Sequence, residues 1–290
     1  MHHCPAVSDA AREAPAAEIH WVVEEPFADL ARMHPAVQRV FPVALRRWRR
    51  SLWRPSVWSE INRFRAALGA QPYDAVVDSQ GLLKSALVCA AARGTKHGFD
   101  RASAREPLAA RFYDVTHAVP KGLHAVERNR RLTAAALGYA LPEGVDYGLG
   151  RSLGNENYIV FLTMTSRADK LWPEARWIEL GNTLGAKIVL PWGSEAEKAR
   201  ATRIASALHH ATVPSRMEIP AIGNLLQKAR AVVGVDTGLT HLAAAFGTRT
   251  VGIYCGSDPA LTGLYGAPNA VNVGAAGRLP SVDEVRQATA

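Results

Sequence analysis

The chain has 290 residues, 48% of them hydrophobic and 21% charged, with a formal net charge of +8. This balance is typical of a folded globular protein, and the length favours two compact domains over one. No run of about eighteen apolar residues predicts a membrane-spanning helix, and the first dozen residues lack the apolar core of a secretion signal.

In the first half, helix and strand patterns alternate, which predicts parallel sheets with crossover helices. Pro5 predicts a helix that runs to about residue 14. Further along, we expect strands at 18–25 and 73–81 and helices at 81–94 and within 116–144. A doubly wound domain normally begins with a central strand, so the first strand is missing from this pattern.

In the second half, the pattern restarts after a segment rich in glycine and asparagine at 144–157, which we interpret as a linker. The predicted domains are therefore 1–148 and 149–290. The elements expected in the second are strands at 158–163 and 187–193, helices at 173–185, 195–210 and 222–231, and a strand–turn–helix–strand unit at 229–256.

The positive charge suggests an anionic partner: a nucleic acid, a membrane surface or a phosphorylated substrate. It is concentrated in "ALRRWRRSLWRPSVW", residues 44–58. This stretch is either a solvated basic helix or loop, or an interfacial surface, since Trp48, Trp53 and Trp58 lie between the arginines. The three cysteines are far apart and fit neither a disulfide framework nor a zinc motif, which favours a reducing cytoplasm.

Polar residues follow two strands of the second half. In "FLTMTSRADKLWPEARW", Thr165, Ser166 and Lys170 precede a helix and are either phosphate ligands or residues of a capping loop. In "VLPWGSEAEKA", Glu197 either accepts hydrogen bonds from ribose or complements the helix dipole, and the spacing alone favours the dipole.

The stretch "VDTGLTHL" is more specific. Thr237 and Gly238 leave backbone amides free where a helix begins, which predicts an anion site. Asp236 is expected to fix the turn or to accept a sugar hydroxyl, and His241 is either a phosphate donor or a structural residue. No dinucleotide fingerprint or Walker motif is present, which argues against those two classes.

Together these segments resemble glycosyltransferase family 9, the ADP-heptose:lipopolysaccharide heptosyltransferases, and in particular its heptosyltransferase I members. The resemblance spans nearly the whole chain, through "VDTGLTHLAAAFGTRTVGIYCGSDPALTGLYG", "TSRADKLWPEARW", "LPWGSEAEKA", "WVVEEPFADLARMHPAVQRVFPVALRRWRR", "YDAVVDSQGLLKSALV", "KHGFDRASAREPLA" and "HAVERNRRL".

The resemblance implies a GT-B fold, with two Rossmann-like doubly wound domains facing across a cleft, the first for the acceptor and the second for the ADP-sugar. It implies an inverting enzyme that moves heptose from ADP-L-glycero-β-D-manno-heptose to the Kdo of Kdo-lipid A. No metal or cofactor is expected. The place of action would be the cytoplasmic face of the inner membrane, peripherally bound, with no nucleic acid as partner.

Carried over by motif, the resemblance assigns two groups of residues. The donor residues are Thr165, Ser166, Lys170, Glu197, Met217, Asp236, Thr237, Gly238 and His241. Glu197 then becomes the ribose-binding acid, which reverses the preference from spacing, and Met217 marks the backbone that meets adenine. The acceptor residues are Arg46, Arg47, Arg49 and Arg105, which suit carboxylates and phosphates.

The chain departs from the family at its beginning. The family's general-base Asp lies in an "SSxGDxxH" turn, and the matching text here begins inside that motif, with His2 as its histidine. We expect the Asp upstream of Met1, through a start assigned too late, and predict no catalytic base in the chain itself. Asp9 is expected to face elsewhere.

Three alternatives remain open from the sequence. The missing Asp is compatible with a non-catalytic module that binds nucleotide-sugar or lipid A. Heptosyltransferase II would share the "DTG..H" pattern. Nucleic-acid binding through the arginine and tryptophan stretch has only composition in its favour.

Overall fold

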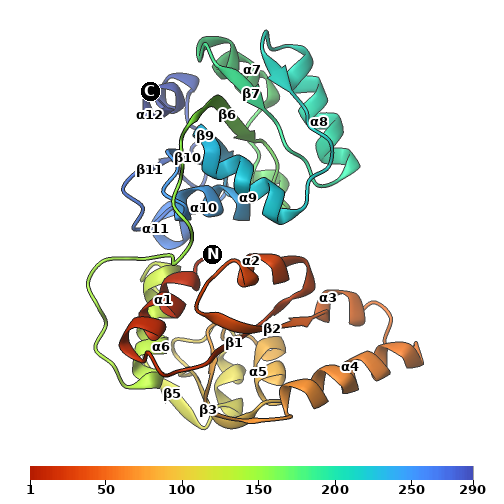
Figure 1. Ribbon diagram of the computed structural model, residues 1–290, viewed down its shortest axis with the longest axis vertical. Coiled ribbons are helices and arrows are strands. Elements are labelled where there is room, and N and C mark those ends of the chain that lie inside the picture. Colours follow the sequence, from red (N-terminus) through yellow and green to blue (C-terminus); the bar gives the residue numbers. More distant parts are fainter. Residues whose placement is uncertain (290) are drawn as a thin grey trace. The chain divides into compact units, whose positions relative to one another are not determined.

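A computed structural model describes residues 1–289 and divides the chain into two compact units, His2–Gly148 and the part from Leu149 onward. Each unit is an α/β arrangement in which every strand pair is parallel (Figure 1). The α/β class expected from the alternating pattern is therefore confirmed. None of the described helices is long and apolar enough to cross a bilayer.

The N-terminal unit contains, in order, α1 (Cys4–Glu13), β1 (Ile19–Glu24), η1 (Glu25–Phe27), α2 (Ala28–Arg32), β2 (Val37–Val43), α3 (Leu45–Trp48), α4 (Pro55–Leu68), β3 (Pro72–Asp78), α5 (Leu83–Cys89), β4 (Arg93–Phe99), η2 (Pro107–Phe112), β5 (Val115–His117) and α6 (Ala125–Leu137). The predicted helix at Pro5 and the predicted strands that became β1 and β3 are confirmed.

The strands of this unit form two separate sheets. One contains β1 and β2, and the other has the order β3-β4-β5. All six residues of β1 are only half-buried, and so are Ala75, Val76 and Val77 of β3. The inner strands of a parallel α/β sheet are normally covered on both faces. The residues of β1 and β3 are less buried than those of such inner strands.

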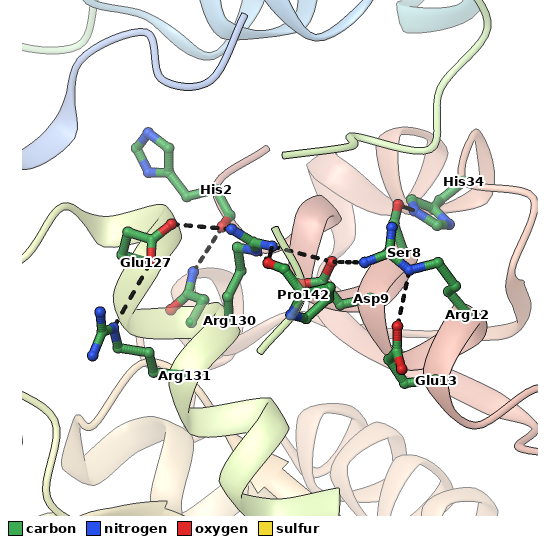
Figure 2. A network of polar contacts seen from close by, with 11 residues as sticks. His2, Ser8, Asp9, Arg12, Glu13, His34, Glu127, Arg130, Arg131 and Pro142 are labelled. Carbon is green, nitrogen blue, oxygen red and sulfur yellow. Dashed lines mark hydrogen bonds and ion pairs between the residues drawn. The ribbon is translucent and has the colours of Figure 1, made fainter. Parts of the chain in front are cut away.

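The helices α1 and α6 pack side by side and are joined by a buried ion pair (Figures 1 and 2). Arg130 of α6 donates to Asp9 of α1 at 2.6 Å, and both side chains are 4% exposed or less. Glu127 and the carbonyl of Pro142 accept two more of its hydrogen bonds, at 3.1 and 2.8 Å. Burial of a charge is tolerated here because almost every polar atom of the pair has a partner.

The C-terminal unit contains β6 (Glu156–Leu162), η3 (Ala168–Lys170), α7 (Glu174–Thr183), β7 (Lys187–Val189), α8 (Glu195–Ser206), β8 (Ala211–Thr212), α9 (Ile219–Lys228), β9 (Ala229–Val235), α10 (Gly238–Ala245), β10 (Thr250–Tyr254), α11 (Pro259–Thr262), β11 (Ala270–Gly274) and α12 (Val282–Thr289). The elements predicted for this half occur in the predicted order, although β7 is shorter than the predicted 187–193.

These strands form one continuous sheet of order β11-β10-β9-β6-β7-β8. Its centre is dry: Val232, Val233 and Val235 of β9 are 0% exposed, and so is Phe161 of β6. Trp177 of α7 packs on Phe161, with ring centroids 4.8 Å apart. The sheet is thereby fixed as a rigid platform for the loops at its carboxyl edge.

Candidate functional site

The site predicted from the sequence lies at the carboxyl edge of the C-terminal sheet. From β6 the chain builds β7 and β8 on one side, and it then crosses to build β9, β10 and β11 on the other. The point where β6 and β9 lie side by side is therefore the switch point of this sheet, which is where open α/β sheets bind ligands.

The turn after β9 begins the helix α10. Thr237 is the N-cap residue with an extended backbone, and Gly238 is the first helical residue. Thr240 fixes the turn, because its buried hydroxyl donates to the carbonyl of Val235 at 2.7 Å. Nothing lies within 4 Å of the place where a Cβ on Gly238 would be, and the first amides of a helix have no partner within the helix itself. The helix start predicted at this turn is present, and its role as an anion site stays a prediction.

Asp236 is the centre of the polar contacts at this edge. Lys170 donates to its carboxylate at 2.6 Å, Ser257 donates at 2.5 Å, and the Nε2 of His241 lies 3.4 Å from it. The hydroxyl of Thr165 donates to the backbone carbonyl of Asp236 at 3.0 Å. Residues from the loops after β6, β9 and β10 therefore meet at one carboxylate.

These contacts set the charge state of Asp236. Its side chain is 9% exposed, and that burial by itself would raise the pKa of the carboxyl group. The hydrogen bonds from His241, Lys170 and Ser257 outweigh burial and hold the pKa of Asp236 well below its usual value. The carboxylate is therefore ionised and compensates the charge of Lys170, whose ammonium group keeps two further N–H donors.

Ser257 has no role in the prediction from sequence. It follows β10 by three residues, within the quoted segment "CGSDPALTGLYG". The signal that could have found it is its place after a strand adjacent to β9, since the carboxyl ends of parallel strands share one edge.

The other donor residues lie on the same unit but are not all joined to this cluster. Ser166 is exposed in the loop after β6, and Met217 is half-buried just before α9. The carboxylate of Glu197 accepts the backbone N–H of Gly193 at 2.7 Å, and its own N–H donates to Ser194 at 3.3 Å. Glu197 therefore closes the turn before α8, and its ribose role stays a prediction.

The predicted acceptor residues lie on the N-terminal unit. Arg46 stacks on Phe27 with its guanidinium 5.8 Å from the ring centroid, and Arg49 and Arg105 are exposed. Arg47 is held by Glu25 at 3.0 Å and by Glu60 at 2.9 Å, and hydrogen bonds to both carboxylates raise its pKa. Its charge is thus balanced within the chain.

The sequence left open that Trp48, Trp53 and Trp58 form one interfacial surface, and for Trp48 this interpretation is wrong. Trp48 is 6% exposed, packs near Phe64 and donates to Glu60 at 2.9 Å. It is a core residue of the α3–α4 region because the helical spacing turns it inward. Trp53 and Trp58 are 73% and 52% exposed.

Asp9, the first acid in the sequence, is paired with Arg130 at 2.6 Å and lies 3.7 Å from Arg12. These contacts place it between α1 and α6, and the expectation that it faces away from any catalytic position stays a prediction. Within residues 1–289, no group of three histidine, cysteine or acidic side chains is placed to hold a metal ion. The three cysteines are free and buried.

Residues 61–289 match glycosyltransferase family 9 (heptosyltransferase). Lipopolysaccharide heptosyltransferase 1 of Pseudomonas aeruginosa is 48% identical over 276 residues, which cover 92% of this chain and 78% of that protein.

Two solved structures are also similar. E. coli heptosyltransferase WaaC with ADP has a TM-score of 0.92 and 42% identity, and the match covers 99% of this chain and 93% of the other. The same enzyme with ADP-2-deoxy-2-fluoro heptose has a TM-score of 0.89, 41% identity and the same coverage. These similarities confirm the GT-B fold class.

Proposed function

The chain belongs to glycosyltransferase family 9, and from this premise we propose that it moves L-glycero-D-manno-heptose from ADP-heptose to the Kdo of Kdo-lipid A. It is a heptosyltransferase of lipopolysaccharide inner-core biosynthesis, and it uses a nucleotide sugar. Identity of 44–48% to heptosyltransferase 1 enzymes favours the first heptose transfer over the second.

The observation that carries the donor proposal is the convergence of three loops on Asp236 beside the start of α10. Amides of the first turn and the helix dipole bind the diphosphate. Lys170, oriented by Asp236, adds a positive charge that stabilises the ADP as it departs. Thr165 and Ser166 supply hydroxyls, and His241 closes the cluster from the second turn of the helix.

Because this stabilisation comes from fixed N–H groups, we propose that transfer needs no metal ion. Activity measured with and without a chelator tests this part. A loss of transfer on chelation, restored by added magnesium, would contradict it.

The acceptor proposal depends on charge. Kdo carboxylates and lipid A phosphates are anions, and Arg46, Arg49 and Arg105 present exposed guanidinium groups. Arg47, already paired with Glu25 and Glu60, orients the segment rather than supplying free charge. Leu52, Trp53 and Trp58, exposed beside arginines, support peripheral contact with the cytoplasmic face of the inner membrane.

The decisive experiment measures two properties of the chain: the affinity for ADP by calorimetry, and the transfer of labelled heptose from ADP-heptose to Kdo-lipid A. We expect Lys170→Ala to weaken ADP binding about tenfold to a hundredfold, because a charge-assisted hydrogen bond is lost.

The matched control is Lys187→Ala, an exposed lysine at the amino end of β7, on the opposite edge of the sheet. Equal ADP affinity of both variants would contradict the donor site. ADP binding without any heptose transfer would favour the non-catalytic alternative instead.

A further inference from the structure

A groove lies between β2 and the helices α3 and α4, which are orange in Figure 1, and we call it the α4 groove. Its volume is about 330 Å³, at the small end of the range of about 300–1,000 Å³ for ligand pockets. Glu25 directly follows β1, Ala44 directly follows β2, and both line the groove. Open α/β sheets bind ligands at the carboxyl ends of their strands. The α4 groove is therefore placed where part of a substrate can lie.

The lining of the α4 groove is mostly apolar. Six apolar residues line it: Phe41, Pro42, Ala44, Trp48, Phe64 and Ala67. Trp48 is 6% exposed and packs edge to face on Phe64, with ring centroids 5.8 Å apart. The residues that α4 contributes lie on one side of the helix, because they repeat at the helical spacing of three and four positions: Glu60, Arg63, Phe64 and Ala67. One face of α4 thereby encloses an apolar space against β2 and α3.

The polar groups in the lining already have partners. Arg47 donates to Glu25 at 3.0 Å and lies 2.9 Å from a carboxylate oxygen of Glu60. The indole N–H of Trp48 donates to the same carboxylate at 2.9 Å. The hydrogen bonds from Arg47 and Trp48 hold the pKa of Glu60 below its usual value, so its negative charge is present and is compensated. The groove therefore suits a hydrocarbon chain better than a ligand that must form hydrogen bonds.

The surroundings of the α4 groove are strongly basic. Between Ala44 and Leu68 the chain has seven arginines and one acid, Glu60. Among residues 1–289, Arg47 is the only one of these arginines that forms an ion pair. Arg63, at the rim of the groove, is exposed, and so is Arg49. Exposed guanidinium groups bind phosphates and carboxylates. An apolar groove with a basic rim fits an amphiphile that has an anionic head group.

Two other classes of ligand fit the α4 groove less well. Pro42 of β2 lines it and has no N–H to donate to an added peptide strand. A nucleic acid needs aromatic faces on which its bases stack, whereas Trp48 is buried and its N–H is engaged. The exposed side chains of Leu52, Trp53 and Trp58 belong to the same segment of the chain. Charge and hydrophobicity together therefore favour a lipid.

We propose that the α4 groove binds the first part of one acyl chain of the acceptor lipid, while the arginines at its rim bind a phosphate or carboxylate of the same molecule. This inference rests on the proposed function and adds a binding site for a part of the acceptor other than its sugars. The groove thus distinguishes a complete lipid acceptor from the same head group without acyl chains.

The first test measures binding to the unmodified chain by calorimetry. The probes are butyl, hexyl and octyl phosphate, each below the concentration at which it forms micelles. We expect the dissociation constant to fall about tenfold or more from butyl to octyl phosphate, because each methylene group buried in the groove adds to binding. Octyl glucoside, whose head group is neutral, should bind about tenfold more weakly than octyl phosphate. Equal affinity across the phosphate series would overturn the proposal, and equal affinity for octyl glucoside would overturn the role of the arginines.

A matched pair of variants locates the bound chain. Ala67→Trp fills the groove from α4 and should weaken the binding of octyl phosphate about tenfold, while that of butyl phosphate does not change. Ala66→Trp adds the same side chain at the preceding position, which is exposed and outside the groove, and it should bind both probes like the unmodified chain. Unchanged affinity for octyl phosphate in Ala67→Trp, or an equal loss in both variants, would contradict binding in the groove.

The second test asks whether the acceptor supplies the acyl chain. Heptose transfer is measured with Kdo-lipid A and with the same acceptor after removal of its acyl chains. We expect Ala67→Trp to raise KM about tenfold for the acylated acceptor and to leave KM and kcat unchanged for the deacylated one. An equal rise for both acceptors would contradict a site for the acyl chain. Unchanged KM for both, despite weaker binding of octyl phosphate, would assign the groove to another lipid and contradict the proposed occupant.

The two tests fail in distinguishable ways. If the unmodified chain transfers heptose to neither acceptor, the proposed function is wrong, whereas the titrations with butyl and octyl phosphate still decide whether the groove binds an alkyl chain. If Ala67→Trp fails to fold, the dependence of affinity on chain length in the unmodified protein decides.

Discussion

In the C-terminal unit the central strands β6 and β9 each have hydrogen-bonded neighbours on both edges, whereas β1 and β3 in the N-terminal unit have one each. The burial of the strands follows this difference: β9 contains five apolar residues at 0–2% exposure, and β1 contains no buried residue. The same alternating sequence pattern therefore gives a dry platform in one unit and a divided sheet in the other.

The two units also keep their buried charges in different places. In the C-terminal unit the charged cluster around Asp236 lies at the carboxyl edge of the sheet. In the N-terminal unit the Asp9–Arg130 pair lies between two helices and serves only to hold them together. The first cluster joins three loops at one edge of a sheet, whereas the second joins two helices.

The largest expected effect is a loss of stability that is confined to the N-terminal unit. Asp9→Ala leaves the buried guanidinium of Arg130 without its shortest ion pair, with only Glu127 and the carbonyl of Pro142 as partners, and we expect a loss of about 3–5 kcal/mol in the free energy of unfolding. Denaturant titration with segment-resolved hydrogen exchange measures it. As a control, Asp283→Ala removes an exposed partner of Arg286 and should cost less than about 1 kcal/mol. Equal effects of the two variants would contradict the architectural role.

The next effect is a dependence on pH. Burial lowers the pKa of His3 from its ordinary 6.5 to about 4, and it also lowers the pKa of His34, His97 and His117. Between about pH 6.5 and pH 4 the unfolded chain therefore binds more protons than the folded one. Stability that is present above pH 6.5 is lost as the pH falls through this window, by up to about 3 kcal/mol from His3.

Hydrogen exchange in the N-terminal unit at pH 7 and pH 5 checks this prediction, after correction for the intrinsic exchange rate. His3→Phe keeps an aromatic ring beside Trp21 and removes the titration, so its pH dependence should be shallower. Asp236 acts differently: because its pKa is depressed, its contribution is lost only below about pH 4. If the C-terminal unit unfolds before the N-terminal unit as the pH falls to about 5, this prediction is wrong.

The smallest effect concerns the C-terminal site. Ser257→Ala removes one hydrogen bond to the buried carboxylate of Asp236 and should cost about 1–2 kcal/mol, while it raises the pKa of that carboxylate. Thermal unfolding as a function of pH measures both. Ser206→Ala, whose hydroxyl donates to a backbone carbonyl on an exposed helix, is the matched control and should change little. If Ser257→Ala changes neither property, Lys170 and His241 suffice to hold Asp236.

Much of the fold could be predicted where the apolar pattern is strong. The run of valines before Asp236 became β9, and the spacing after Gly238 became α10. The sequence analysis missed β4, "RGTKHGF", because it has few apolar residues, and its place comes from pairing with β3 and β5. It also missed α4, an exposed helix with only Val57 and Leu68 buried.

The candidate site shows the same division. The strand–turn–helix geometry at Asp236, Thr237 and Gly238 is local, so the sequence by itself determined that a helix begins there, as it determined the alternation of strands and helices. Tertiary structure alone brought Lys170 and Ser257, 66 and 21 residues away, to the carboxylate of Asp236. It alone turned Trp48 inward and left a gap between β1 and β3. The physical reason is that the spacing of apolar residues records only which face of a helix or strand is buried. Which loops come together, and which strands are neighbours, depends on the order of strands in the sheet, and this order is set by long-range pairing.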